Sequence, residues 1–137
     1  MVNPIAVIVA TVVAFAVGAL WYGPLFGRQW RVLMNFSEGH ATTNFGTEGI
    51  SMTSAMLGGF IITLVLVYVL AVLMQALGIQ SAGQAAWFGF MVSAGFIGTT
   101  MMNGVFYERR PWALYLINTS HYVVAIIVAA LVLFYLG

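Results

Sequence analysis

The sequence predicts an all-α membrane protein with four transmembrane helices in an antiparallel bundle. Two observations predict this fold class: the composition, and the gathering of apolar residues into four long runs. Of the 137 residues, 63% are hydrophobic and only 5% are charged, whereas a soluble domain carries about 25% charged residues. A surface so poor in charge suits a bilayer. The length suits one transmembrane domain over residues 1–137.

Each apolar run is close to the roughly 20 residues that an α-helix needs to cross the hydrocarbon core. Because lipid offers no partner to free backbone groups, each run is expected to be helical. The expected helices cover about residues 4–23, 54–77, 85–103 and 111–136. Asn3 before Pro4 favours a helix start, and the Gly23–Pro24 pair is expected to end the first helix.

The charged side chains gather in two of the three connections. One group lies in the loop of about residues 24–52 and the other in the turn before the fourth run; together they are Arg28, Arg31, Glu38, Glu48, Glu108, Arg109 and Arg110. With four crossings these two connections share one side of the membrane. Cytoplasmic loops are enriched in arginine and lysine. We therefore expect a multi-pass protein of the cell membrane, with these loops cytoplasmic and both termini outside.

The four arginines are interpreted as topology signals and as contacts to lipid phosphates. The start of the long loop, RQWRVLMNF, places Trp30, Leu33 and Met34 near one helical face, which predicts a short interfacial helix. The rest of that loop is polar and is expected to lie at the surface.

Several classes of chemistry are not expected. The net charge is only +1, so nucleic-acid binding is not expected. The chain has no cysteine, which excludes disulfides and thiolate metal sites. No P-loop, GxSxG or HExxH pattern occurs. No metal and no cofactor is expected.

The fourth run contains two polar residues at helical spacing, Asn118 and His121. At 1.5 Å per residue, His121 lies roughly 15 Å along the helix from Pro111, which is near mid-bilayer. A polar residue at that depth is expected to face the bundle or a wet cavity. The other helices offer partners near the same side of the membrane: Trp21, Tyr22, Thr99, Thr100 and Asn103. A polar cluster between the first, third and fourth helices is therefore predicted, with Glu108 as a further ligand candidate.

Two interpretations of this cluster remain open. In the first, its members are interhelical hydrogen bonds, worth about 0.6 kcal/mol each on average. In the second, they line a site for a small polar or aromatic ligand, or a proton path. The first is favoured, because one histidine without a buried carboxylate partner is a poor proton relay.

Small residues recur in the first and third runs. Pairs four residues apart allow helix backbones to approach closely. The candidate packing residues are Ala14, Gly18, Gly89, Ser93, Ala94, Gly95 and Gly98. They favour the third helix as the central packing element, or as an interface between copies of the chain.

Two blocks carry a family resemblance: GALWYGPLFGRQW at 18–30 and ERRPWALYLIN at 108–118. They resemble an uncharacterised family of small integral membrane proteins of bacteria and fungi, domain of unknown function seventeen-sixty-one (DUF1761). The resemblance spans nearly the whole chain. It implies a four-helix membrane protein and supplies no activity. The position of His121 is more often aromatic in that family.

The leading hypothesis is a non-enzymatic membrane component that acts by helix packing, as an accessory or self-associating bundle. Its partners are then the lipid bilayer and copies of itself or a larger membrane complex. The alternative is a small oligomeric transporter or channel with a polar site between helices one, three and four. A third hypothesis, a membrane enzyme using Glu108 with Arg109 and Arg110 at the cytoplasmic face, has little support because topology alone explains the ERR turn.

Overall fold

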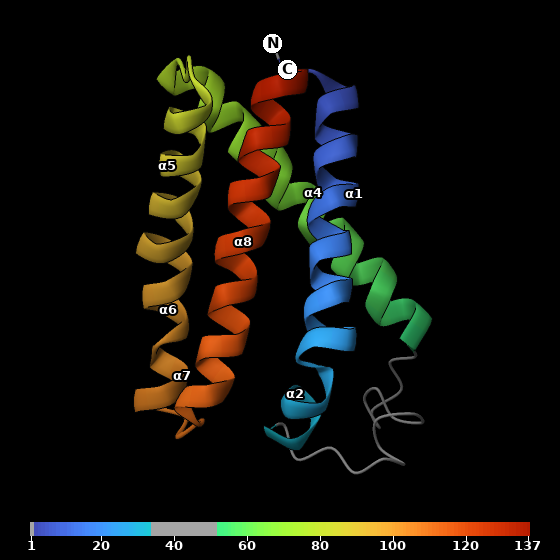
Figure 1. Ribbon diagram of the computed structural model, residues 1–137, viewed down its shortest axis with the longest axis vertical. Helices are drawn as coiled ribbons and strands as arrows, with labels where there is room; N and C mark the ends of the chain where they lie inside the picture. Colours follow the sequence, from blue (N-terminus) through green and yellow to red (C-terminus); the bar gives the residue numbers. More distant parts are fainter. Residues whose placement is uncertain (1, 34–51) are drawn as a thin grey trace.

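The computed structural model describes residues 2–33 and 52–137. Within these ranges, four helical segments are long and apolar enough to cross a membrane: Pro4–Leu25, Thr53–Leu77, Ala82–Phe106 and Trp112–Leu136. We call them the first to fourth spans. They alternate in direction, so both ends of the chain lie at one end of the molecule (Figure 1). The chain is an all-α membrane protein, as the composition predicts.

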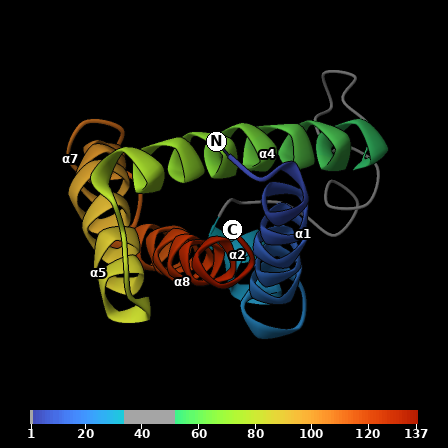
Figure 2. The same ribbon diagram turned by 90° about the horizontal axis from the view of Figure 1, so that it is seen from above.

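The fourth span is the centre of the bundle. Its helix α8 (Trp112–Leu136) packs against α1 (Pro4–Leu20) on one side and α5 (Ala82–Val92) on the other. The long helix α4 (Met52–Leu77) crosses this row obliquely (Figure 2). The interpretation that makes the third helix the central packing element is therefore wrong: the third span has one main neighbour, α8, whereas α8 has three.

The core is built from small residues in the half of the molecule that carries the termini. Alanines dominate it because they allow helices to approach closely where lipid provides no hydrophobic drive for association. The alanines come from all four spans: Ala6, Ala10, Ala14, Ala71, Ala85, Ala125, Ala129 and Ala130. Larger buried side chains such as Val67 and Ile126 fill the space between them.

The first span does not end at Gly23–Pro24. It continues as the π-helix η1 (Trp21–Leu25), which contains Pro24 and closes with a hydrogen bond of 2.8 Å from Phe26 N to Trp21 O. Proline has no N–H and its ring crowds the carbonyl one α-turn earlier, so a wider turn accommodates it. A Cβ at Gly27 would collide with the Tyr22 carbonyl oxygen. This glycine lets the chain turn directly into α2 (Gly27–Leu33), the short helix expected at the start of the loop; Met34 lies outside the described residues.

The third span begins earlier than the expected residue 85, because the Ser81 side chain caps α5 by accepting from Gln84 N at 3.1 Å. After α5 the helix widens into the π-helix η2 (Ser93–Gly98) and continues as α6 (Thr99–Met101) and α7 (Asn103–Phe106). The wider turn changes which residues face α8.

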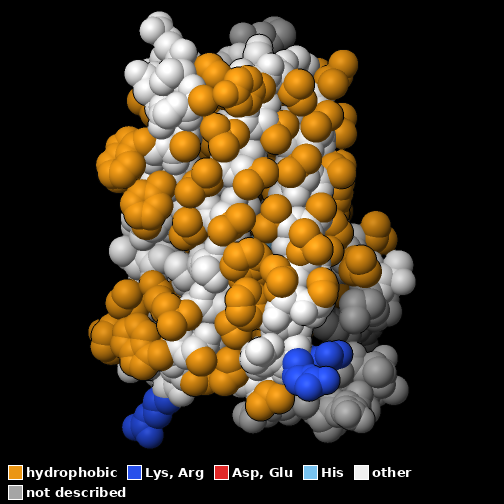
Figure 3. Space-filling view, viewed as in Figure 1, with side chains coloured by type: hydrophobic (Ala, Val, Ile, Leu, Met, Phe, Trp, Pro, Cys, Tyr) orange, Lys and Arg blue, Asp and Glu red, His pale blue; other side chains and the backbone are white. Residues whose placement is uncertain are grey.

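The described charged residues lie at the end of the molecule opposite the termini. At their own end of the molecule, the two terminal segments are joined by a hydrogen bond of 3.1 Å from Asn3 Nδ2 to Leu136 O. Arginine side chains project only at the opposite end of the face that Figure 3 shows, below a wall of apolar side chains. Glu38 and Glu48 lie outside the described residues. The chain is thus a multi-pass membrane protein with its described charges at one membrane face.

Candidate functional site

A polar lock joins the first and fourth spans in their charged half. The Tyr22 hydroxyl donates a hydrogen bond of 2.6 Å to Asn118 Oδ1. The indole N–H of Trp21 is shared between Ile117 O at 3.1 Å and Ser120 Oγ at 3.2 Å. The π-helix η1 positions both aromatic rings, since they occupy its first two residues. Tyr22, Asn118 and Trp21 therefore form the interhelical bonds that the first interpretation of the cluster predicts.

His121 lies beside this lock. Its ring meets Tyr22 edge-on at 5.2 Å between centroids. Its Nε2 lies over Gly18, where a Cβ would come within 3.1 Å of that nitrogen. Among the described residues, the buried Nδ1 has no hydrogen-bond partner. His121 therefore fills space between α1 and α8, and among the described residues it takes no part in the hydrogen bonds of the lock.

The third span meets α8 through a different set of groups. The Tyr115 hydroxyl donates to Gly98 O at 2.8 Å. A Cβ at Gly98 would touch Thr119, and one at Gly89 would come within 3.0 Å of the Ile127 Cα. These close approaches place the backbone of the third span directly against α8.

The predicted contribution of Thr99, Thr100 and Asn103 to the inner cluster is wrong, because all three are exposed on the outside of the third span. Thr99 Oγ1 donates to Gly95 O at 2.6 Å within its own helix. The inward positions of this segment are taken by Ser93 and Gly98, which are buried. Small residues there allow contact with α8, and the neighbouring threonines are turned outwards.

The candidate packing residues divide between two faces. Ala14 is buried, and Gly18 lies beneath the ring of His121. Gly89 and Gly98 contact α8 and Ser93 is buried beside them, its hydroxyl donating to Gly89 O at 2.8 Å. Ala94 is half-buried. Gly95 is exposed, and a Cβ there would meet nothing within 4 Å.

A small cavity of about 50 Å³ lies between α8 and the end of the third span. Its lining combines polar side chains with apolar ones: Met101, Gly104, Val105, Arg110, Leu114, Tyr115 and Asn118. Asn118 thus faces two ways: its oxygen accepts from Tyr22 in the lock, and its side chain also borders the cavity.

The ERR turn folds over this cavity. Arg109 has a φ of 57°, and Arg110 N donates to Gly104 O at 2.9 Å. This bond closes the turn around Arg109, whose left-handed backbone conformation is one that glycine usually adopts. Arg110 Nε also binds Glu108 Oε1 at 3.1 Å in a largely exposed pair. The turn therefore returns Arg110 towards Asn118 and leaves Glu108 at the surface.

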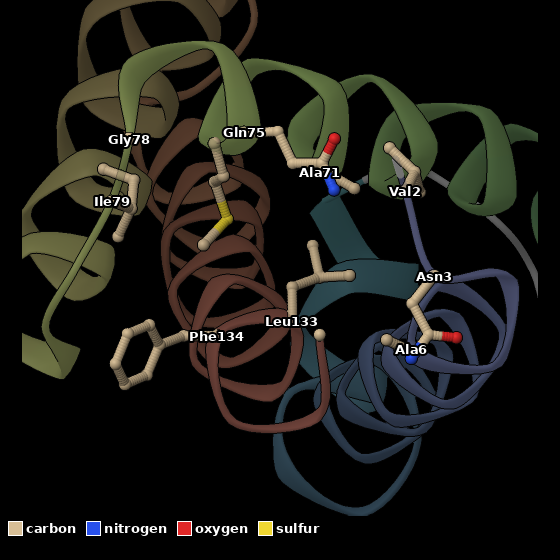
Figure 4. Close-up of a pocket in the computed structure, with 11 residues that line it drawn as sticks. Val2, Asn3, Ala6, Ala71, Gln75, Gly78, Ile79, Leu133 and Phe134 are labelled. Carbon is tan, nitrogen blue, oxygen red and sulfur yellow. The ribbon is translucent and has the colours of Figure 1, made fainter.

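A larger cavity, of about 290 Å³, lies at the terminal end between α1, α4 and α8. Apolar side chains such as Ala6, Ala71 and Leu133 form most of its wall, with Asn3 and Gln75 at its border (Figure 4). The Asn3 amide is already bonded to Leu136 O and Ile5 N. This space lacks a convergent set of polar groups.

The remaining predicted residues lie at the charged end. Arg28 and Arg31 are exposed on α2, which follows the first span, whereas the ERR turn precedes the fourth span. In the described part of the chain, no three His, Asp or Glu side chains are grouped so that they could hold a metal ion.

Sequence reasoning missed three members of the polar set: Tyr115, Thr119 and Ser120. Tyr115 and Thr119 are four residues apart, so a helix places them on one face. This spacing can be seen in the sequence alone. Ser120 was not predictable, because its role depends on the indole of Trp21 reaching across from η1.

The comparisons with known proteins agree with this architecture. The family described as protein of unknown function (DUF1761) matches residues 5–134, which is nearly the whole chain. Neither the curated proteins nor the solved structures give a match. The chain belongs to the DUF1761 family of proteins of unknown function.

Proposed function

We propose that this chain is a non-enzymatic membrane component that self-associates through the outer face of the third span, formed by Gly95, Thr99, Thr100 and Asn103. The observation that carries the proposal is the exposure of these four small or polar residues. The Thr99 hydroxyl is already bonded to Gly95 O, so it is the Asn103 amide and the Thr100 hydroxyl that gain a partner when another helix covers them.

The shape of this face supports close helix contact. Gly95 has no atom within 4 Å of its Cβ position, so a neighbouring backbone could approach there. Gly95, Thr99 and Asn103 follow one another at four-residue intervals, the spacing of small-xxx-small association motifs. A second copy in the same orientation presents the same residues at the same depth. Two-fold symmetry then pairs each residue with itself, and an asparagine amide, being both donor and acceptor, can pair with its copy.

The inner polar groups support a structural role. Tyr22, Asn118, Trp21 and Tyr115 are bonded to one another or to backbone carbonyls across helices. The carboxylate of Glu108 binds Arg110 in an exposed turn, which topology explains without catalysis. We therefore assign no catalytic residue.

The test compares two glycines with open space around the Cβ position, Gly95 and Gly58. The protein is reconstituted in lipid with donor and acceptor fluorophores on separate copies. We expect Gly95→Leu to reduce energy transfer between copies several-fold, because the added side chain separates the backbones. Gly58→Leu on α4 serves as the matched control and should retain the transfer. Equal transfer in both variants would remove the third span from the interface.

We also propose that the charged end faces the cytoplasm and the termini face outwards, since arginines favour the cytoplasmic side. A cysteine introduced at exposed Gln80 should react with a membrane-impermeant thiol reagent in intact cells. A cysteine at exposed Tyr107 should react only after the membrane is opened. The reverse pattern would invert the topology.

A small oligomeric transporter or channel is the second candidate, favoured by the cavity that Asn118 borders. In that case Asn118→Leu abolishes solute or ion flux in proteoliposomes while the protein still folds. Flux that is retained in full excludes a role for this residue.

A further inference from the structure

The larger cavity lies where α4 crosses the row of the other spans. α4 runs obliquely past α1 and α8 (Figure 2), and short side chains line the space between them (Figure 4). Ala6 of α1 and Ala71 of α4 each contribute only a methyl group. The volume of about 290 Å³ is roughly twice that of an engineered apolar cavity that binds benzene. The space is therefore large enough for a sizeable apolar group.

The polar side chains at the border of this cavity already have partners. The Asn3 side chain bonds to Leu136 O and Ile5 N, and Gln75 also has an interaction within the chain. Among the described residues, none that lines the cavity is charged. A buried water needs about two to four polar partners, whereas apolar walls gain dispersion contacts when an apolar group fills the space. The lining therefore favours a neutral alkyl chain.

The cavity lies at the terminal end of the bundle, within one leaflet. Its lining extends past the ends of two helices, to Gly78 after α4 and Gly137 after α8. In α4 it reaches inwards to Ala71, six residues before the helix ends at Leu77, which is about 9 Å at 1.5 Å per residue. Because the hydrocarbon core is about 30 Å thick, this depth corresponds to the upper part of the acyl chains of one leaflet.

We propose that this cavity binds the upper part of an alkyl chain, whose polar end stays at the border beside Asn3. The bilayer supplies this chemistry through phospholipid tails, which surround the four spans at a far higher concentration than any free amphiphile. Within the described residues, the third span contributes nothing to the lining. The proposal therefore does not depend on self-association through that span.

The methyl group of Met74 reports on the cavity without any substitution. Met74 lines the cavity and is only 7% exposed, whereas Met56 on the same helix is 51% exposed and lies outside the lining. The full chain, deuterated except for carbon-13-labelled methionine methyl groups, is placed in phospholipid nanodiscs. We expect nuclear Overhauser transfer from the acyl-chain protons to both methyl groups. A second sample, with chain-deuterated phospholipid and added protonated octanol, detects a free amphiphile instead.

Two substitutions on α4 separate the cavity from the outer surface. Ala71→Phe fills the cavity and should reduce the transfer to Met74 several-fold, while the transfer to Met56 is unchanged. Ala76→Phe is the matched control and should retain both signals, because Ala76 is exposed on the same helix and does not line the cavity. Ile79→Trp, at a lining position between α4 and α5, replaces Ala71→Phe if that variant does not fold.

The proposal is overturned if Met56 receives transfer from the lipid and Met74 receives none from either source, since the cavity then holds no alkyl chain. It is also overturned if the transfer to Met74 is undiminished in folded Ala71→Phe, because the chain then lies outside the cavity. Transfer to Met74 from the phospholipid confirms the tail as the occupant. Transfer from octanol alone supports the alkyl site and assigns it to a free amphiphile.

Discussion

The hydroxyl of Tyr22 lies 2.6 Å from the amide oxygen of Asn118, although 96 residues separate them in the chain. This bond crosses from the first span to the fourth, in a region where the solvent is lipid. Tyr22 lies at the start of the π-turn that carries the first span through Pro24, and its hydroxyl reaches α8 from there. The bond locks the charged half of the bundle, and the alanine-rich core packs the other half.

Removing this bond should destabilise the bundle modestly. We expect Tyr22→Phe to lower the free energy of unfolding in mixed micelles by about 0.6 to 1.7 kcal/mol, the average and the maximum measured for hydrogen bonds between membrane helices. Tyr68→Phe, at a lipid-exposed tyrosine of α4, is the control and should change the stability little. Equal losses in the two variants would show that the lock contributes nothing.

The contact of the third span with α8 requires a glycine at position 89. A Cβ there would lie 3.0 Å from Ile127 Cα and 3.3 Å from Ile126 O, and backbone atoms cannot move aside without separating the helices. Gly89→Ala should cost about 1–3 kcal/mol of unfolding free energy, as overpacking does. Gly58→Ala has open space and should be neutral or stabilising, because alanine is the better helix former. A neutral Gly89→Ala contradicts this packing.

Arg109 occupies a backbone conformation that glycine adopts without cost. Its φ is 57°, and the left-handed region costs an L-residue roughly 1–2 kcal/mol. Arg109→Gly should therefore raise the unfolding free energy by about 1 kcal/mol relative to Arg109→Ala. Both variants remove the same charge, so their difference isolates the backbone term. If the two unfold alike, this residue does not hold the left-handed conformation.

Two threonines with buried hydroxyl groups offer a matched comparison. Thr119 Oγ1 has no hydrogen-bond partner among the described residues, whereas Thr11 Oγ1 donates to Val7 O at 2.7 Å. An unpaired buried hydroxyl costs about 1–3 kcal/mol. Thr119→Val keeps the methyl group near Gly98 and should stabilise the protein by about 1 kcal/mol, while Thr11→Val should not. A stabilisation of Thr11→Val alone would reverse this assignment. Chemical denaturation of both variants gives the answer.

The fold class followed from the sequence because composition and run length reflect one physical demand, the absence of backbone partners in lipid. The grouping of charges at one end was predictable as well, because four crossings place the first and third connections on the same side of the membrane. The Tyr22–Asn118 contact could be predicted from the sequence, since both residues lie at the same depth in helices that are predicted to pack.

The rest of the site could not be predicted because it depends on helix phase. The π-turns at Trp21–Leu25 and Ser93–Gly98 each shift the residues that follow around the helix axis. In and after the second π-turn, the buried positions are Ser93 and Gly98. The polar residues that follow are exposed: Thr99, Thr100 and Asn103. A regular helical spacing does not contain this information.

Cross-linking in native membranes tests self-association through the outer face of the third span. Single cysteines at Gly95 and Thr99 are oxidised, with a cysteine at lipid-exposed Tyr68 of α4 as the control. Because two-fold symmetry brings identical residues together, we predict disulfide-linked dimers of two 14.8 kDa chains from Gly95→Cys and Thr99→Cys and none from Tyr68→Cys. Dimers from the α4 position alone, or equally from all three, would contradict the proposed interface.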